Sequence, residues 1–371
     1  MKRALHFIPA FSIGGVESLI MSLYRNTDRT KVQFDFLIEV DDDLEVFNEI
    51  KEMGGNVYCL PKLEKNHLLR YIKQIESFFS KNASKFDIVH CHHIERATVV
   101  LYYARKYGID FRIIHAHTDS IEDLKFKHIR KIFMRMNNHL STHLFACSQA
   151  AGEFQFGKSK KAFIVLKNAI DSKKFSYNEE KRKVMRQLMK LKNRFVVGHT
   201  GRFTYPKNHW KIIDVFNELH TQNPNAHLLL VGDGPLKEEI EQKVRALGIE
   251  DVVTFTGARD DIADLLQAMD IFILPSFYEG FCISLLEAQS VGLPCVTSDI
   301  IPKEVEVTSL IKKISLSKSD KEWADELLTQ KNSYREDSSH LIVKAGYDIE
   351  ENARWLERFY LRNKEVVQQC I

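Results

Sequence analysis

Short apolar runs alternate with longer amphipathic stretches along almost the whole 371-residue chain, and no other feature restricts its fold as strongly. This alternation is typical of parallel sheets with helices on both faces. The predicted strands are 4–8, 34–38, 57–60, 88–90, 112–115, 144–146, 162–165, 195–200, 226–231, 252–256, 271–275 and 294–297. Helices predicted between them include 15–24, 68–80, 207–219 and 235–247. The pattern predicts an α/β chain with two Rossmann-like domains.

A charge-rich segment at 171–194 is the predicted boundary between the two halves. We therefore expect an N-terminal domain over 1–172, a C-terminal domain over 173–347 and a terminal segment over 348–371. An amphipathic pattern predicts a helix over most of that terminal segment. The stretch at 308–339 is polar and weakly patterned, and it predicts no particular element.

The overall charge and the cysteines limit the classes of function. A formal net charge of +3 argues against a dedicated nucleic-acid binder, so we expect no nucleic-acid partner. None of the six cysteines has zinc-ligand or redox spacing, which indicates free thiols in a reducing compartment. No apolar stretch is long enough to span a bilayer. We expect a cytoplasmic protein that can lie at the inner face of the plasma membrane.

The most informative motif covers residues 275–288, where a predicted strand runs into a loop and then a helix. Gly280 would permit a tight turn, and the helix is predicted to begin near Phe281. The peptide N–H groups predicted to face the crevice are those of Phe281, Cys282 and Ile283. Such groups bind phosphate, and ligands of open α/β sheets lie at the carboxyl ends of the strands.

Two carboxylates, Glu279 and Glu287, bracket this turn. A carboxylate accepts hydrogen bonds from two neighbouring hydroxyls, so each suits a ribose or a hexose. The alternative is that Glu279 caps the helix and Glu287 is a surface residue. Taken alone, each glutamate fits the alternative, and the complete motif favours a binding site.

Two further loops follow predicted strands of the second half. The first contains Gly201, Arg202 and Lys207, whose cations would neutralise a diphosphate, Arg as a fork and Lys as a point charge. The second contains Gly232 and Gly234, which would let the backbone approach a nucleotide base. Solvated loop cations and a simple tight turn are the alternatives.

These clusters resemble the retaining GT-B glycosyltransferases of family 4, and most closely the branch that makes capsules and exopolysaccharides. The family's Gly-Gly-x-Glu loop is matched at 14–17, and its Asn-Gly-Ile-Asp segment at 168–171, where Ala169 replaces a glycine. The similarity spans nearly the whole chain and is strongest at 298–307 and 347–360. The family's basic pair and glutamate pair are matched by Arg202 and Lys207 and by Glu279 and Glu287.

The resemblance implies two Rossmann-like domains that face each other across a central cleft, with a C-terminal helix that returns to the first domain. It also implies retaining transfer of a hexose or N-acetylhexosamine from a nucleotide diphosphate sugar. The expected donor is a UDP-sugar. The expected acceptor is a lipid-linked precursor or a growing surface polysaccharide, as in capsule or exopolysaccharide synthesis.

The resemblance also implies roles for individual residues. Arg202 and Lys207 would hold the diphosphate, Glu287 the ribose and Glu279 the donor sugar. The implied donor-binding set is Gly14, Gly15, Gly201, Arg202, Lys207, Gly232, Gly234, Glu279, Gly280, Phe281, Cys282, Ile283 and Glu287. The implied catalytic set is His117, Glu279, Arg202 and Lys207.

The histidine of the catalytic set is one of two candidates that follow each other closely. The family places a histidine near the reacting carbon, and His115 and His117 both come at a predicted strand end. We favour His117 because polar residues 118–119 follow it, while a structural role for it is the alternative. Histidines at 90–93 could line the acceptor side or bind a metal, but no carboxylate spacing supports a metal site.

The acidic run at 41–43 resembles the metal-binding motif of the other large glycosyltransferase fold. It follows a strand of the first domain, far in sequence from the donor loops, so we interpret it as a solvated loop. We therefore expect no required metal or cofactor.

The stretch 125–135 is rich in cations, with Phe126, Ile129 and Phe133 on one helical face. It could rest on an anionic membrane surface, and a core-packed helix with a solvated basic face is the alternative.

Three other functions compete with transfer. A GT-B-fold sugar-nucleotide epimerase would share the donor pocket but release a free epimer. A non-catalytic sugar-nucleotide-binding protein would not need both the basic pair and the glutamate pair. A nicotinamide dehydrogenase ranks last because no Gly-x-Gly-x-x-Gly follows a predicted strand.

Overall fold

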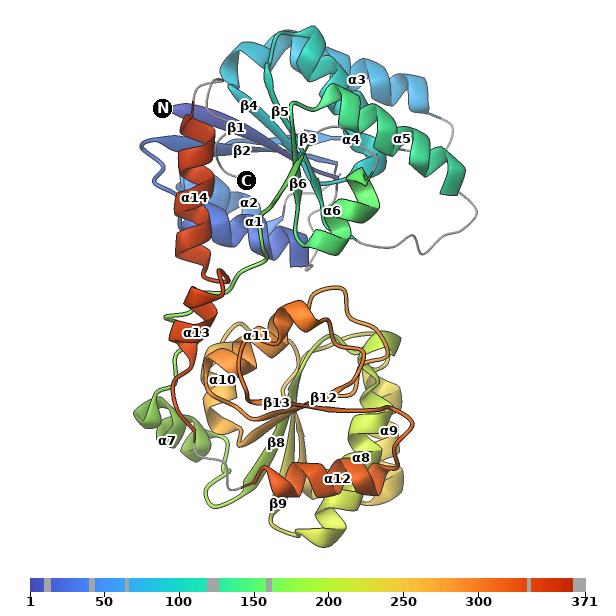
Figure 1. Ribbon diagram of the computed structural model, residues 1–371, viewed down its shortest axis with the longest axis vertical. Coiled ribbons are helices and arrows are strands. Elements are labelled where there is room, and N and C mark those ends of the chain that lie inside the picture. The colour runs from blue at the N-terminus through green and yellow to red at the C-terminus, as the bar shows by residue number, and fades with distance from the viewer. Residues whose placement is uncertain are drawn as a thin grey trace. The chain divides into compact units, whose positions relative to one another are not determined.

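The chain folds into two compact α/β units, in a computed structural model that describes residues 1–9, 15–39, 44–63, 67–118, 127–157, 162–331 and 335–362. Unit 1 comprises Met1–Ala169 and Ile349–Ile371, and unit 2 comprises Ile170–Asp348. Each unit is a parallel sheet with helices on both faces (Figure 1). This is the two-part Rossmann-like architecture that the alternating pattern predicts.

Unit 1 is built on a seven-stranded parallel sheet with the order β3-β2-β1-β4-β5-β6-β7. Its strands are β1 Lys2–Ile8, β2 Val32–Glu39, β3 Val57–Leu60, β4 Ile88–Cys91, β5 Phe111–Ala116, β6 His143–Ala146 and β7 Phe163–Val165. Its helices are α1 Gly15–Arg25, α2 Glu45–Glu52, α3 Leu68–Asn82, α4 Ile94–Lys106, α5 Lys127–Leu140, α6 Gln149–Phe156 and α14 Ile349–Leu361.

Unit 2 has a six-stranded parallel sheet with the order β10-β9-β8-β11-β12-β13. Its strands are β8 Phe195–Thr200, β9 Ala226–Val231, β10 Val253–Phe255, β11 Ile271–Leu274, β12 Cys295–Ser298 and β13 Ile311–Ile314. Its helices are α7 Glu179–Leu188, α8 His209–Gln222, α9 Lys237–Leu247, α10 Ile262–Ala268, α11 Ile283–Ser290, α12 Asp320–Thr329 and α13 Ser339–Lys344.

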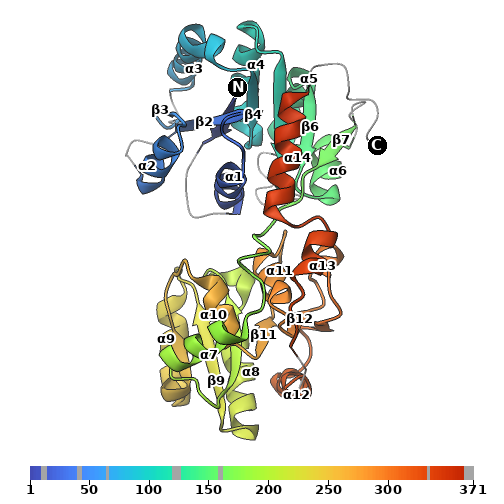
Figure 2. The same ribbon diagram turned by 90° about the vertical axis from the view of Figure 1, so that its left-hand side faces the viewer.

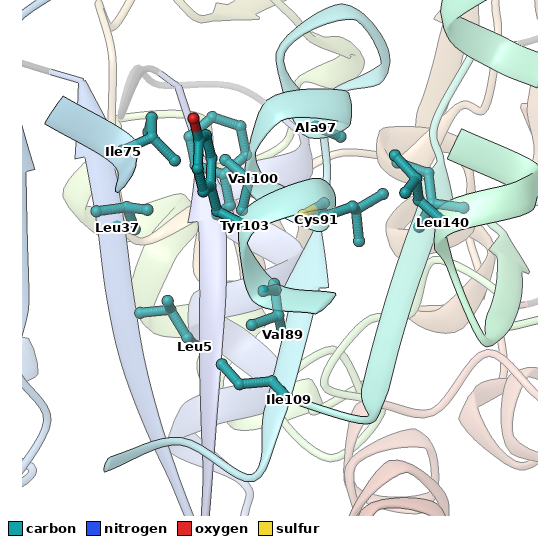
Figure 3. Packing of buried hydrophobic residues seen from close by; sticks show 14 of the residues in the cluster. Leu5, Leu37, Ile75, Val89, Cys91, Ala97, Val100, Tyr103, Ile109 and Leu140 are labelled. Carbon is teal, nitrogen blue, oxygen red and sulfur yellow. The ribbon is translucent and has the colours of Figure 1, made fainter. Parts of the chain in front are cut away.

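The two faces of each sheet carry separate hydrophobic cores because side chains alternate along a strand. In β1, Leu5 and Phe7 contribute to the core under α3 and α4, whereas Ala4 and Ile8 contribute to the core under α1 and α14. Figure 3 shows the first of these cores, with side chains from the strands and helices interleaved. Complete burial of each large apolar side chain contributes about 1.5–3 kcal/mol.

The terminal helix α14 belongs to unit 1, although about 180 residues separate it from the rest of that unit. Its buried face contains Ala353, Leu356, Phe359 and Tyr360, which join the core that α1 also covers. Figure 2 shows α14 lengthwise beside the strands of unit 1. The return of the C-terminal helix to the first domain is therefore confirmed.

The structure contains two elements in the stretch that appeared unpatterned. Strand β13 extends the second sheet, and α12 begins with a capping box in which Ser319 and Glu322 each bond the other's backbone. The signature Ser-x-x-Glu was present in the sequence. Strand β13 has only four residues, two of them lysines, so its periodicity is too short to recognise.

Both sheets change direction at one position, and this fixes where a ligand can bind. The chain starts at a central strand, moves to one edge and then crosses to the other side, between β1 and β4 in unit 1 and between β8 and β11 in unit 2. In open α/β sheets a ligand binds at the carboxyl ends of the strands beside such a position.

Candidate functional site

The loops after β8 and β11 in unit 2 are held together at the point where that sheet changes direction. The Asn208 side chain donates to the carbonyl of Pro275 over 3.0 Å, and the Phe277 amide donates to the carbonyl of Pro206 over 2.8 Å. The Tyr205 and Phe277 rings stack with their centroids 5.0 Å apart. Two of the predicted clusters, 60 or more residues apart, thus form one site.

A lysine and a glutamate from these two loops form an ion pair. The Lys207 ammonium contacts both carboxylate oxygens of Glu279, at 2.7 and 2.8 Å, and the Ser276 hydroxyl donates to the same carboxylate over 2.6 Å. The Lys207 side chain is 21% exposed and that of Glu279 is 6% exposed. Burial lowers the pKa of Lys207, but Cys282 and Glu279 outweigh it, so the pKa is raised and the ammonium stays charged.

Arg202 lies exposed in the same loop as Lys207. Its guanidinium makes no hydrogen bond or ion pair with the residues that the structure describes. An unpaired guanidinium offers a planar fork of donors that suits phosphate oxygens. The edge of the sheet therefore combines one paired and one unpaired cation.

Gly280 has a different role from the one that its position in a turn predicted. Its φ is not in the left-handed region, so the turn does not require a glycine, and that part of the prediction is wrong. A methyl group at Gly280 would approach only the Tyr278 hydroxyl, at 3.9 Å. The absence of a side chain instead leaves open space in front of the backbone.

Helix α11 begins at Ile283, two residues later than predicted, with Cys282 as its N-cap. Within the described part of the chain, the N–H groups of Phe281, Cys282 and Ile283 have no backbone acceptor. These amides are the unpaired donors at the positive end of a helix dipole. They lie next to the open space at Gly280, as an anion site requires.

The other glycines of this region are explained by packing between loops. Gly232 has a φ of +142°, and a Cβ there would lie 2.0 Å from the Gly201 carbonyl oxygen. Gly234 has a φ of +157°, and a Cβ would lie 2.6 Å from the Phe203 carbonyl oxygen. The backbones after β8 and β9 thus touch directly, which explains both residues without a ligand.

Glu287 lies half-buried on α11, one helical turn after the start of that helix. Burial raises its pKa from 4.5 to about 8, and Lys174 opposes that change only in part. The Glu287 carboxyl has no hydrogen-bond partner within the ranges that the structure describes. A half-buried carboxyl with a raised pKa and no partner is common in ligand-binding sites.

Unit 1 carries a cluster of five histidines where its own sheet changes direction. They are His6 on β1, His90 on β4, His92 just after β4, His115 on β5 and His117 just after β5. His92 connects two of them, with His92 Nε2 3.0 Å from His6 Nδ1 and His92 Nδ1 3.0 Å from His117 Nε2. Burial lowers the pKa of His117 to about 4, so its imidazole is neutral near pH 7.

His93 does not belong to this cluster, although the sequence placed it with His90 and His92. Its imidazole instead caps α4, accepting from the Arg96 amide and lying 3.3 Å from Glu95. The membership of His6 was missed, because only the order of the strands brings β1 beside β4.

Several predicted positions lie partly or wholly outside the described residues. Gly15 is the first residue of α1, whereas Gly14 and the acidic run 41–43 lie outside. On α5 the exposed apolar residues are Ile132 and Met136, whereas the predicted Phe133 is half-buried. The predicted Phe126 and the side chain of the predicted Ile129 also lie outside the described part of the chain. No helix in the described ranges is long and apolar enough to cross a membrane.

The sequence matches one family profile. Residues 180–337 match the family described as "Glycosyl transferases group 1". That segment covers most of unit 2, including both loops of the ion pair.

Two relatives match over most of their length. EpsF of Bacillus subtilis (strain 168), named as a glycosyltransferase, is 32% identical over 97% of this chain and 96% of its own. The second is the UDP-Gal:alpha-D-GlcNAc-diphosphoundecaprenol alpha-1,3-galactosyltransferase of Escherichia coli. It is 27% identical over 76% of this chain and 78% of its own.

A solved structure shares the fold of the whole chain. Anabaena HepE in complex with UDP and glucose superposes with a TM-score of 0.73, covering 97% of this chain and 99% of its own at 19% identity. The similarity extends through both units, and it confirms the GT-B fold.

Proposed function

This chain belongs to the group 1 glycosyltransferases, and on that premise we propose that it is a retaining enzyme of family 4. The proposed reaction moves a hexose or N-acetylhexosamine from a UDP-sugar to a lipid-linked or growing surface polysaccharide. The observation that carries this proposal is the Lys207–Glu279 pair, with Arg202 unpaired in the same loop, at the carboxyl edge of β8 and β11. The two cations suit the phosphates of a sugar diphosphate, and the buried carboxylate beside them suits the hydroxyls of its sugar.

Each side chain of this edge has a part in donor binding. Arg202 and Lys207 hold the diphosphate, and Glu279 accepts hydrogen bonds from hydroxyls of the donor sugar. Glu287 accepts from the ribose hydroxyls. The amides of 280–283 approach the sugar and phosphate at the open space beside Gly280. Of the remaining members of the donor-binding set, Gly15 acts at the donor phosphate and sugar.

The chemistry depends on the charge that develops on the leaving diphosphate. The C–O bond between the sugar and the phosphate breaks, and the fixed cations and amides stabilise the departing oxygen. The acceptor oxygen forms the new bond on the same face of the sugar, and its proton passes to the departing phosphate oxygen. His117, a neutral imidazole, acts beside the reacting carbon.

The relatives support the nature of the two substrates. The galactosyltransferase of E. coli is named for a UDP-linked donor and a diphosphoundecaprenol acceptor, and the HepE structure contains UDP. Other relatives are named for Vi polysaccharide and amylovoran biosynthesis. We propose the same substrate classes for this chain.

A donor panel tests the proposal directly. The protein is incubated with UDP-, GDP-, ADP- and dTDP-linked sugars and a polyprenyl-diphosphate-linked acceptor, and the product is analysed by mass and NMR. We expect a UDP-sugar to extend the acceptor with the anomeric configuration of the donor. An inverted linkage would contradict the retaining assignment, and a free epimer would indicate an epimerase.

We expect transfer to continue after removal of divalent metal. The leaving diphosphate is stabilised by side chains and amides, so no ion is needed to bridge it. EDTA treatment should therefore not lower kcat. A loss of activity that added Mg²⁺ restores would contradict this prediction. If activity returns when EDTA is removed and no metal is added, the loss was an artefact of the treatment.

Replacing Gly280 by alanine should separate donor binding from folding. The added methyl meets nothing closer than 3.9 Å, so the free energy of unfolding should not fall. A donor that lies against this backbone would be displaced, at a cost of about 1–3 kcal/mol, or roughly ten-fold to a hundred-fold in affinity. Calorimetry with a UDP-sugar and thermal unfolding measure both quantities.

The matched control for Gly280→Ala is Gly232→Ala. A methyl at Gly232 would lie 2.0 Å from a backbone oxygen, so this variant should lose stability instead. If Gly280→Ala binds the donor with unchanged affinity, the donor does not approach that part of the loop.

We also propose that α5 brings the enzyme to the inner face of an anionic plasma membrane. Ile132 is 56% exposed and Met136 is 44% exposed, and the exposed cations Lys131 and Arg135 lie beside them. An apolar pair flanked by cations suits an anionic lipid surface. In vesicle flotation, the Ile132→Ser/Met136→Ser variant should float less with phosphatidylglycerol vesicles than the wild type. Equal flotation would contradict the role of α5.

A further inference from the structure

The proposed transfer uses one histidine of the unit 1 cluster, His117, and does not explain why four more imidazoles lie in the same cluster. Side chains two residues apart on a strand lie on the same face, so His6, His90 and His115 continue the buried rows of Ala4, Ile88 and Ile113. The register pairs His6 with His90 directly. Cys91 pairs with Ile114, so the next residues, His92 and His115, lie side by side.

The imidazole rings lie almost in contact. The ring centroids of His115 and His117 are 4.1 Å apart, those of His92 and His117 are 5.3 Å apart, and those of His92 and His115 are 5.4 Å apart. The three rings therefore surround a common point at the carboxyl end of β4 and β5.

His115 is the member of the cluster whose hydrogen bonding is incomplete. Its side chain is only 1% exposed, and neither ring nitrogen has a hydrogen-bond partner among the described residues. Buried polar atoms are almost always paired, and an unpaired one costs free energy. A missing ligand at this position would account for that cost.

We propose that His92, His115 and His117 bind a divalent transition-metal ion of the Zn²⁺ class. One nitrogen from each ring lies within 4.8 Å of the others. In a tetrahedral zinc site with Zn–N bonds of about 2.0–2.1 Å, ligand nitrogens are about 3.3 Å apart. His92 Nδ1 and His117 Nε2, at 3.0 Å, are already near that spacing, and a nitrogen of His115 lies within 4.8 Å of both.

The surrounding residues orient the proposed ligands. Metal-bound histidines usually donate their second N–H to an acceptor, which fixes the tautomer. If His92 ligates through Nδ1, its Nε2–H faces His6 Nδ1 at 3.0 Å. The Tyr360 hydroxyl lies 2.6 Å from His90 Nδ1 and 3.5 Å from His6 Nε2, and it supports both of these rings.

The donor set selects the class of metal. The group consists of imidazoles alone, which suit Zn²⁺, Co²⁺, Ni²⁺ or Cu²⁺, whereas Mg²⁺ and Ca²⁺ require oxygen ligands. Burial lowers the pKa of all three rings, to about 4 for His117, so they present neutral lone pairs near pH 7. Three ligands leave a fourth position for water or another oxygen ligand.

A second group, His6, His90 and His92, also has three nitrogens within 4.8 Å. It is the weaker candidate, because His90 already has the Tyr360 hydroxyl as a partner at Nδ1, whereas neither nitrogen of His115 has a partner among the described residues. The proposed site shares His117 with the proposed transfer, so a bound ion would engage the imidazole that we place beside the reacting carbon, although the diphosphate itself needs no metal.

The experiment uses the full chain, purified without a polyhistidine tag and stripped with a chelator. Zn²⁺ binding is measured by calorimetry, Co²⁺ binding by its visible absorption, and both by the shift in melting temperature. The variants are His115→Phe, which keeps a planar aromatic ring and removes two nitrogens that have no partner among the described residues, and His117→Ala at the half-buried edge. His139→Ala, an exposed histidine of α5, is the control.

We expect one Zn²⁺ per chain, a tetrahedral Co²⁺ spectrum and a higher melting temperature with Zn²⁺ for the wild type and His139→Ala. Both cluster variants should lower the affinity for Zn²⁺ more than about 100-fold. Even the loss of a residue that only orients a metal ligand lowers metal affinity roughly 10–100-fold. The proposal is overturned if the wild type shows no saturable Zn²⁺ binding. It is also overturned if folded His115→Phe and His117→Ala bind Zn²⁺ as the wild type does.

Discussion

Replacing Lys207 by methionine should reduce kcat/KM for sugar transfer about 10²- to 10³-fold, the typical effect of losing one group that stabilises developing charge. Methionine keeps most of the volume of the lysine stem but removes the ammonium. The leaving diphosphate then keeps Arg202 and the amides of 281–283 but loses the cation nearest to Glu279. Steady-state kinetics with saturating acceptor measure the change.

The same substitution should also destabilise unit 2. Among the described residues, it leaves the Glu279 carboxylate, 6% exposed, with the Ser276 hydroxyl as its one side-chain partner. Breaking one side of a fully buried pair costs about 3–5 kcal/mol, and the half-buried position of Lys207 makes about 2–3 kcal/mol the reasonable expectation. Activity and stability must therefore be measured separately, by turnover and by urea unfolding.

The double variant Lys207→Met/Glu279→Gln separates the two effects. The amide that Glu279→Gln introduces can still accept a hydrogen bond from the Ser276 hydroxyl and carries no charge, so most of the lost stability should return. Transfer should stay as low as in the single variant, because the diphosphate still lacks its cation. If the double variant recovers activity together with stability, the pair has a structural role and the proposed donor contact is wrong.

Lys211→Met is the matched control. Lys211 lies on α8, close in sequence to Lys207, and its ammonium pairs with Asp320 on α12 at 2.7 Å. It removes the same charge from the same unit but away from the carboxyl edge. We expect little change in kcat/KM for this variant, and an equal loss in both variants would contradict a specific role for Lys207.

The comparison between these two lysines shows what a sequence can and cannot reveal. The sequence predicted nearly every strand because each strand is a local apolar run, and it identified Lys207 and Glu279 as members of one site. It did not show that they pair with each other, or that Ser276 holds the carboxylate. Those contacts depend on how two loops meet in space, which no local pattern encodes.

The histidine cluster was beyond reach for the same reason. The sequence contains His6 some 84 residues before His90, and neither position has a local signature of a site. Strand β4 lies next to β1 only because the sheet changes direction there. Many strand orders are compatible with the same alternation of runs, so the cluster becomes visible only in three dimensions.

The affinity for a UDP-sugar should rise on the order of 50- to 100-fold between pH 6 and pH 8.5. Burial raises the pKa of Glu287 to about 8, so only about 1% of the free protein carries the carboxylate at pH 6 and most of it does at pH 8.5. If ribose hydroxyls donate to that carboxylate, the ionised form is the competent one, and the apparent Kd varies inversely with its population. Calorimetry with a UDP-sugar is preferable to UDP, whose terminal phosphate titrates in the same range.

Glu287→Gln should remove this pH dependence, because an amide does not titrate. Glu238→Gln, an exposed glutamate on α9, removes the same charge and should keep the wild-type profile. A wild-type affinity that is constant over this range would show that Glu287 does not receive the ribose as a carboxylate.

The stability of the free protein gives an independent measure of the same carboxyl group. In the folded state the pKa of Glu287 is raised from 4.5 to about 8, so between these values the folded chain holds a proton that the unfolded chain releases. The contribution of this proton to the free energy of unfolding is therefore fully present below about pH 4, and it is lost as the pH rises to about 8. Glu287→Gln should melt at a higher temperature than the wild type at pH 9 and at nearly the same temperature at pH 5. Glu287→Gln would then gain stability and lose donor affinity, as we expect for a residue that is retained for binding. A lower melting temperature for this variant at pH 9 would mean that the carboxylate has a partner within the protein.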